Sequence, residues 1–91
     1  MVIERFKERP GEAAGAEVYR RFRERGRLAP AGLEYVASWV ERDYGRCFQV
    51  MSTDEQQLLA EWMANWRDLI EFEVIPVMTS TEAAAAIAPR L

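Results

Sequence analysis

Residues 33–52 read LEYVASWVERDYGRCFQVMS, and this stretch decides the fold. Side chains alternate along residues 33–42 and again along residues 46–52, so each run has the two-residue period of a strand. Asp43, Tyr44 and Gly45 stand between the two runs and are typical of a turn. The stretch therefore predicts a β-hairpin in the middle of the chain.

The residues before the hairpin predict a strand and a helix. Residues 1–7 contain β-branched and aromatic side chains and predict a strand that ends near Pro10. Residues 12–25 have apolar side chains at helical spacing, and Gly26 is placed to end that helix. The hairpin is thus preceded by one strand and one helix.

The residues after the hairpin repeat that pattern in reverse order. Residues 53–56 have the spacing of a capping box, which predicts a helix start, and the helix is expected to run to about Leu69. Residues 70–78 alternate again and predict a strand that ends at or soon after Pro76. A second capping box at residues 79–82 predicts a short helix, which Pro89 stops.

This order, β-α-β-β-α-β with a short C-terminal helix, predicts an α+β fold of the ferredoxin-like type. Two right-handed crossovers place both main helices on one face of a four-stranded antiparallel sheet. Five arginines and one glutamate in residues 20–27 would then lie beside the second helix. Residues 54–73 hold six acids and one arginine, so the two helices attract each other.

One face of the sheet is expected to lie under the helices and the other to stay open. For the first strand, both alternations carry one charge, Glu4 in one and Arg5 in the other, so its covered face stays undecided. We expect the covered face to hold Val36, Val40, Phe48, Val50, Phe72 and Val74. The open face is expected to hold Tyr35, Ala37, Trp39, Cys47, Gln49, Met51, Glu71, Glu73 and Ile75.

That open face is too apolar for water, and such patches usually mark an interface or a ligand site. Two copies packed sheet to sheet would form a dimeric α/β barrel with an enclosed, partly polar cavity. We therefore expect a homodimer, with a small organic ligand as a second partner. The residues expected to line the cavity are Tyr35, Trp39, Gln49, Met51, Glu71 and Glu73.

Composition limits the chemistry further. The 91 residues allow one domain, residues 1–91, and so small a domain is marginally stable unless a second subunit supports it. No histidine is present and Cys47 is the only cysteine, so zinc fingers, intramolecular disulfides and histidine-based triads are excluded. No metal or cofactor is expected. A free cysteine and the lack of a membrane-length apolar run favour the cytoplasm.

Five segments together resemble a bacterial family of small proteins defined only as a domain of unknown function. They are VIERFK, VYRRFRERGR, GLEYVASWV, RCFQVM and EWMANWRDLIEFEVIPV, and they span nearly the whole chain. The resemblance implies a ferredoxin-like dimeric α/β barrel, similar in architecture to antibiotic-biosynthesis monooxygenases. It implies no catalytic residues. Several of those relatives use a cavity histidine, which this chain lacks, so histidine-based barrel chemistry is in doubt.

Two further groups of residues permit more than one interpretation. Glu71 and Glu73 share a strand face and would supply an acid/base pair inside a barrel, although ion pairs with Arg5, Arg46 or a partner chain are favoured two to one. Cys47 is more often a small buried residue than a nucleophile when no histidine is available as base. Trp62 and Trp66 are spaced as core residues rather than as cofactor contacts.

The arginine-rich RRFRERGR, residues 20–27, suggests phosphate binding, and the fold order is also that of an RNA-recognition motif. The net charge of -3 and the absence of the motif's basic and aromatic pattern in residues 45–51 argue against nucleic acid. The leading hypothesis is a ligand-binding barrel, with a cofactor-independent oxygenase or isomerase as the natural enzyme class. The alternative is a non-catalytic interaction or regulatory module whose open sheet face only forms the dimer.

Overall fold

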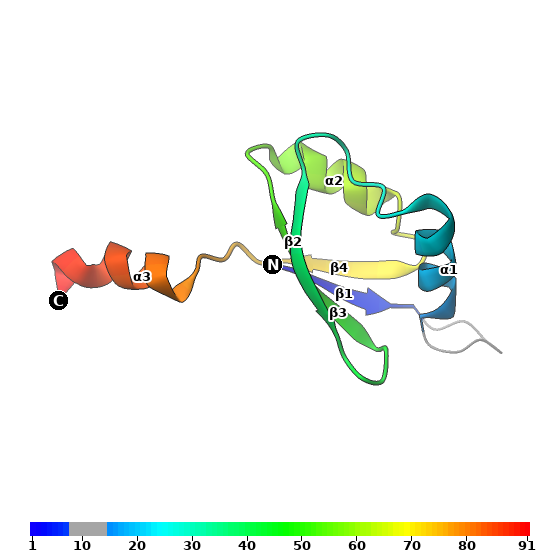
Figure 1. Cartoon of the computed structure of the whole chain (residues 1–91), viewed down its shortest axis with the longest axis horizontal. Coiled ribbons are helices and arrows are strands. Elements are labelled where there is room, and N and C mark those ends of the chain that lie inside the picture. Colours follow the sequence, from blue (N-terminus) through cyan, green and yellow to red (C-terminus); the bar gives the residue numbers. More distant parts are fainter. Residues whose placement is uncertain (8–14) are drawn as a thin grey trace.

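The chain folds around a four-stranded antiparallel sheet with strand order β2-β3-β1-β4, as Figure 1 shows. The computed structural model describes residues 1–7 and 15–91. The β-α-β-β-α-β-α order and this strand order confirm the predicted ferredoxin-like arrangement. The elements are β1 (Val2–Phe6), α1 (Ala16–Arg25), β2 (Glu34–Val40), β3 (Arg46–Ser52), α2 (Gln56–Ala64), β4 (Ile70–Val74), α3 (Ser80–Ile87) and the single 3₁₀ turn η1 (Ala88–Arg90).

The hydrophobic core lies between the sheet and α2. Trp62 is fully buried and stacks at a tilt on Phe72 of β4, with ring centroids 5.8 Å apart. Removing two tryptophans and their neighbours from water is the main stabilising contribution in so small a domain. The other buried members of this core are Val2, Leu33, Met63, Trp66, Leu69 and Ile70.

Helix α1 covers the same side of the sheet but packs loosely on it. None of its residues is fully buried, and Tyr19 and Phe22 keep about two fifths of their surfaces exposed. An ion pair holds the helix near its middle, where Arg21 binds Asp68 beyond α2 with an N–O distance of 2.6 Å. This contact agrees with the expected attraction between the basic and acidic segments.

The sheet faces differ from the expectation in β3. Glu4 pairs with Cys47 and Val2 with Gln49, and paired residues point to the same side of an antiparallel sheet. Since Val2 is in the core, Cys47 and Gln49 also face the helices. The prediction that Phe48 and Val50 are covered while Cys47, Gln49 and Met51 are open is therefore wrong.

A bulge in β2 accounts for a second difference. The register between β2 and β3 shifts between Tyr35 and Ala37, so Tyr35 pairs with Met51 on the helix side while Trp39 pairs with Phe48 on the open side. Tyr35 was expected on the open face, and this prediction is also wrong. Placement of Ala37, Trp39, Glu71 and Glu73 on the open face is confirmed.

The two predicted capping boxes have different outcomes. Thr79 caps α3 as predicted, since its hydroxyl accepts a hydrogen bond from the Glu82 amide while the Glu82 carboxylate accepts one from the Thr79 amide. Thr53 does not cap α2. Its hydroxyl accepts a hydrogen bond from the Glu55 amide instead. The helix begins at Gln56, with Glu55 rather than Thr53 at its N-cap position.

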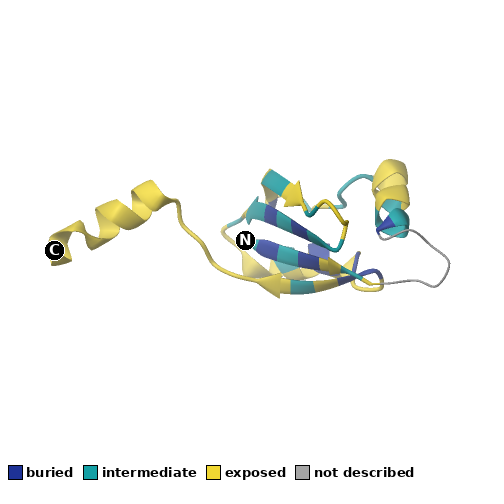
Figure 2. Cartoon of the chain, turned by 90° about the horizontal axis from the view of Figure 1, so that it is seen from below, coloured by how far each residue is buried: buried dark blue, intermediate teal, exposed yellow. Residues whose placement is uncertain are grey.

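The C-terminal segment leaves the body as an arm, residues 76–91, that Figure 2 shows as exposed along its length. It follows β4 directly and ends in α3 and η1. Helix α3 has no buried residue. The arm makes the molecule 55 Å long but only 29 Å and 17 Å in its other dimensions.

Candidate functional site

A pocket of about 240 Å³ lies between the helices and the sheet, where α1 stands away from the strands. We call it the inner pocket. Its walls are mostly apolar, with a few polar groups among them, which is the usual composition of a small-molecule site. Its lining residues are Glu4, Phe6, Val18, Tyr19, Phe22, Arg27, Ser38, Val40, Cys47, Gln49, Trp62, Trp66 and Ile70.

Glu4 is the most unusual of these groups. It lies on β1, faces the helices and is only 6% exposed. Burial raises the pKa of its carboxyl from 4.5 to about 7, against smaller opposing effects of the Cys47 thiol, which hydrogen bonds to it, and of the Arg27 charge. Near neutral pH this carboxyl is therefore able both to donate and to accept a proton.

Cys47 stands opposite Glu4 on β3 and shares its surroundings. Burial, with Glu4 as a further cause, raises the pKa of the thiol to about 12. The thiol is thus protonated at neutral pH, and a protonated thiol is a poor nucleophile. The structure confirms Cys47 as a small buried residue.

Arg27 lies at the edge of the inner pocket, just beyond α1. Its backbone carbonyl accepts hydrogen bonds from the indole nitrogens of both Trp62 and Trp66, each at 3.0 Å. Its guanidinium carbon lies 3.6 Å from the ring centroid of Tyr35 and 5.2 Å from that of Phe22. Both the main chain and the side chain of Arg27 are therefore held in place before any ligand arrives.

The backbone around Arg27 explains how α1 ends there. Gly26 has φ 72° and ψ -161°, a conformation almost restricted to glycine, and its amide donates to the Phe22 carbonyl. Leu28 also has a positive φ, 62°. Two such residues turn the chain sharply, so the Arg27 carbonyl points at α2 and its side chain reaches the pocket.

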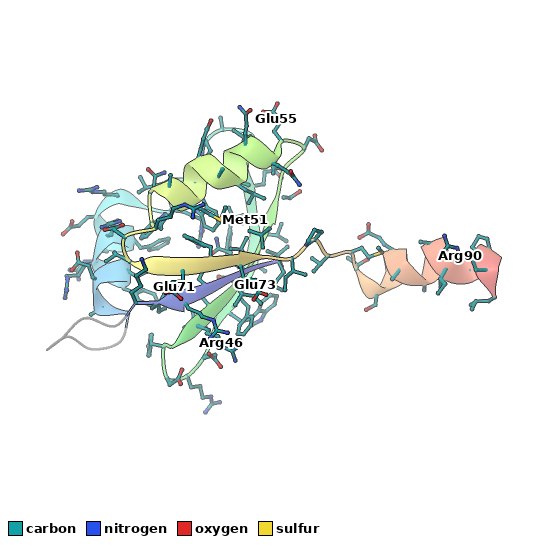
Figure 3. The ribbon with its side chains drawn as sticks, turned by 180° about the vertical axis from the view of Figure 1, so that it is seen from behind. Arg46, Met51, Glu55, Glu71, Glu73 and Arg90 are labelled. Carbon is teal, nitrogen blue, oxygen red and sulfur yellow. The ribbon has the colours of Figure 1, made fainter. Side chains whose placement is uncertain are left out.

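Three of the six residues predicted to line a cavity lie on the helix side of the sheet. Gln49 lines the inner pocket and donates through Nε2 to the Met51 sulfur at 3.2 Å. The hydroxyls of Tyr35 and Ser38 are 2.8 Å apart, and Ser38 lines the pocket. In Figure 3, Met51 is seen between the sheet and α2. The prediction thus included part of the inner pocket, although it placed these residues on the opposite face.

The other three, Trp39, Glu71 and Glu73, lie on the open side, which we call the outer face. It is composed of Ile3, Arg5, Ala37, Trp39, Arg46, Phe48, Val50, Glu71 and Glu73, the residues whose partners across the sheet share that side. Figure 3 shows Glu71 and Glu73 following one another along β4, away from α2.

Charges on the outer face are arranged in rows across the strands. Glu71 lies directly opposite Arg5, and Arg5 lies opposite Arg46. Arg46 is already bound by Glu41, with N–O distances of 2.7 Å and 2.9 Å. Within the described chain, Arg46 is therefore the partner of Glu41 rather than of Glu71 or Glu73.

Neither side of the sheet offers a metal site in the part of the chain that the structure describes. No three cysteine, aspartate or glutamate side chains of residues 1–7 and 15–91 come together as ligands. Among the same residues, no helix has both the length and the apolar character needed to cross a membrane.

Sequence reasoning missed Glu4 and Arg27 as site residues. Glu4 was left undecided against Arg5, and Arg27 was treated only as part of a basic segment. The signal for Glu4 was its place between Val2 and Phe6, two residues that are typical of a covered face. No comparable signal existed for Arg27, because its position depends on Gly26 and on tryptophans more than thirty residues away.

Comparison with known proteins gives one match. The model of the family described as "Domain of unknown function (DUF3303)" matches residues 1–91, the whole of the chain. No curated protein and no solved structure matches the sequence.

Proposed function

Because the chain belongs to the DUF3303 family, whose description assigns no reaction, we propose from geometry alone that it binds a small organic molecule in the inner pocket. One observation supports this most: a pocket of about 240 Å³ lies between α1 and the sheet. Protein interiors are normally packed without such voids. A pocket with aromatic walls and a buried carboxyl is better suited to a ligand than to stability.

Polar groups in the pocket converge from separate elements. Glu4 comes from β1, Gln49 from β3 and Arg27 from the connection after α1. Such groups orient a ligand while the apolar walls provide most of the binding free energy. Their convergence supports recognition of a specific molecule rather than nonspecific hydrophobic binding.

The test is a fragment screen by thermal shift and ligand-observed NMR on the wild type and on a filled pocket. Val18→Trp places a large side chain in the pocket from the loosely packed helix α1. We expect fragments to raise the melting temperature of the wild type and not of Val18→Trp, since binding to the native state stabilises it by mass action.

Val36→Trp is the matched control, because Val36 is 59% exposed and lies outside the pocket. It should bind fragments as the wild type does. If Val18→Trp, folded by circular dichroism, binds the same fragments with unchanged affinity, the inner pocket is not the site.

Proton transfer, as in an isomerase, is a second candidate because the Glu4 carboxyl has a pKa of about 7. A general acid or base works best when its pKa is near the working pH. Fragments with an acidic C–H should then exchange it for deuterium in D₂O faster with the wild type than with Glu4→Gln. Equal exchange rates for the wild type and Glu4→Gln would show that Glu4 does not transfer the proton. Ligand binding would then be the remaining function proposed for the pocket.

We further propose that the protein forms a homodimer through the outer face. Trp39 is 60% exposed there, beside Phe48 and Ile3, and a patch of this kind favours burial against a second copy. The prediction that Trp39, Glu71 and Glu73 line a cavity between the two outer faces of such a dimer remains open to test.

The free thiol of Cys47 favours a reducing compartment, and the cytoplasm is the proposed location.

A further inference from the structure

The arginines of the described chain differ in how their charge is balanced. Three of them are half-buried: Arg21, Arg27 and Arg46. Arg21 binds both carboxylate oxygens of Asp68, at 2.8 Å and 2.6 Å, and Arg46 binds both of those of Glu41. The guanidinium of Arg27 has no ion pair with any described residue. It is therefore the half-buried cation of this part of the chain that lacks an anion.

Glu4, the acidic residue of the pocket, does not fill that role. Its carboxyl hydrogen bonds with the Cys47 thiol, and its raised pKa of about 7 means that it is largely neutral below that pH. The Arg27 guanidinium instead lies over the rings of Tyr35 and Phe22, and these contacts hold it in place without neutralising its charge. Its N–H donors are thus preorganised and available to a ligand.

Next to this cation, the pocket is apolar. Trp62, Trp66 and Ile70 line it, and a volume of about 240 Å³ holds about ten non-hydrogen atoms at the packing density of organic matter. A ligand of this size that also neutralises Arg27 needs one compact anionic group at one end. The part of its surface that faces Trp62, Trp66 and Ile70 must be apolar.

Resting on the proposed function of the inner pocket, we propose that its ligand is a small organic monocarboxylate. The carboxylate pairs with the guanidinium of Arg27, and an aromatic or branched apolar body lies against Trp62 and Trp66. A carboxylate matches the fork of a single guanidinium with two parallel hydrogen bonds. A phosphate would carry more charge than one arginine neutralises, and Arg27 is the one cation among the described lining residues.

Three probes of similar size test the charge requirement: phenylacetate, its planar neutral isostere phenylacetamide, and the cation phenethylamine. Their affinities are measured at pH 6.5 by isothermal titration calorimetry and by the fluorescence of Trp62 and Trp66 in a Trp39→Phe background. We expect phenylacetate to bind about tenfold or more tightly than the neutral amide, with the cation weakest, since a charged hydrogen-bonded pair outweighs a neutral one.

Arg27→Gln should remove that preference, lowering the affinity for phenylacetate about tenfold or more while changing that for phenylacetamide less than about threefold. Arg27→Lys keeps the positive charge but loses the two parallel N–H donors of the guanidinium. It should give a preference for phenylacetate over phenylacetamide between those of the wild type and Arg27→Gln. Arg23→Gln, on the exposed part of α1, is the control and should behave as the wild type. Circular dichroism of each variant verifies the fold.

The outcomes separate the two proposals. If the amide or the amine binds as tightly as the acid, or if Arg27→Gln keeps the full preference for the acid, the carboxylate assignment is wrong while the pocket remains a binding site. If none of the probes binds and no fragment of the broader screen does so either, both proposals are overturned.

Discussion

Glu4 illustrates how one buried residue links stability to the site. Its carboxyl lies among apolar side chains and has a pKa near 7, against 4.5 when it is free in solution. The folded state therefore holds this proton more tightly than the unfolded state. Between pH 4.5 and pH 7 the unfolded chain releases the proton first, so stability falls as the pH rises through this range.

The first prediction is that Glu4→Gln removes this loss. From the raised pKa, the wild type should lose about 3 kcal/mol of unfolding free energy relative to Glu4→Gln between pH 4.5 and pH 8. Urea denaturation of both proteins across that range measures the difference. Among the described groups that interact with Glu4, Tyr19 and Cys47 have raised pKa values and stay uncharged between those pH values.

Glu41→Gln serves as the control with the opposite sign. Arg46 lowers the pKa of Glu41, so that carboxylate stabilises the fold above its pKa and loses this effect as the pH falls. The stability difference between wild type and Glu41→Gln should therefore grow, not shrink, with rising pH. A wild type that tracks Glu4→Gln at every pH would show that Glu4 ionises as it does in water.

At the residue scale, the sequence permitted only part of the site to be predicted. Gln49, Met51 and Tyr35 were selected because they were placed on an open face that was too apolar for water, and they do lie near the inner pocket. Glu4 was undecided because each alternation of the first strand carries one charge, and the burial of this carboxyl depends on the whole sheet. Arg27 acquires its role only when Trp62 and Trp66 fix its carbonyl.

At the scale of elements, strand β3 shows why alternation alone does not identify a covered face. Phe48 and Val50 are more apolar than Cys47 and Gln49, so hydrophobicity favoured the wrong face. The outer-face residues Phe48 and Val50 are at least as apolar as the core-facing residues of β3, so the hydrophobic pattern does not distinguish the two faces of this strand. The bulge between Tyr35 and Ala37 then shifts the register of β2 against β3, and no residue pattern in the sequence predicts this shift.

The turn that follows α1 positions Arg27 at the edge of the inner pocket. The last turn of α1 passes into Gly26, whose backbone angles suit glycine almost alone, and next into Arg27. Apart from Gly26 itself, its two chain neighbours and nearby helix backbone, no heavy atom of the described residues lies within 4 Å of where a Cβ on Gly26 would stand. Any cost of a side chain there is consequently backbone strain rather than a clash.

The second prediction follows: Gly26→Ala should lower the free energy of unfolding by about 1–3 kcal/mol. It should also weaken binding in the inner pocket, because a relaxed turn displaces Arg27. Gly45→Ala is the control, since that glycine lacks a positive φ and meets first a flexible Asp43 carboxylate at 3.1 Å. Equal losses in the two variants, by urea denaturation, would contradict a special role for the turn.

On the scale of the whole molecule, the shape is longer than the chain length requires. A folded domain of this length has a radius of gyration of about 12 Å, whereas this chain has 15.4 Å. The excess comes from the arm that Figure 1 shows leaving the sheet beyond β4. The arm also exposes the apolar side chains of Val77, Met78, Ile87 and Leu91.

A monomer would thus leave both the outer face and the arm in water. Helix α3 has eight residues, and isolated helices of that length are marginal in water. The outer face carries Arg5 and Arg46 beside Glu71 and Glu73, so it presents both signs of charge. A two-fold axis brings one patch against a copy of itself, and mixed charge permits that contact without net repulsion.

The last prediction is that the wild type is a dimer and that Trp39→Glu is a monomer. Light scattering coupled to size exclusion at micromolar concentration should give about twice 10.5 kDa for the wild type and a single 10.5 kDa for the variant. A carboxylate placed twice in an apolar contact costs several kcal/mol, which exceeds what a small interface tolerates. Trp39→Phe keeps the apolar contact and should stay dimeric, whereas a wild type that scatters as a monomer at every concentration would refute association through the outer face.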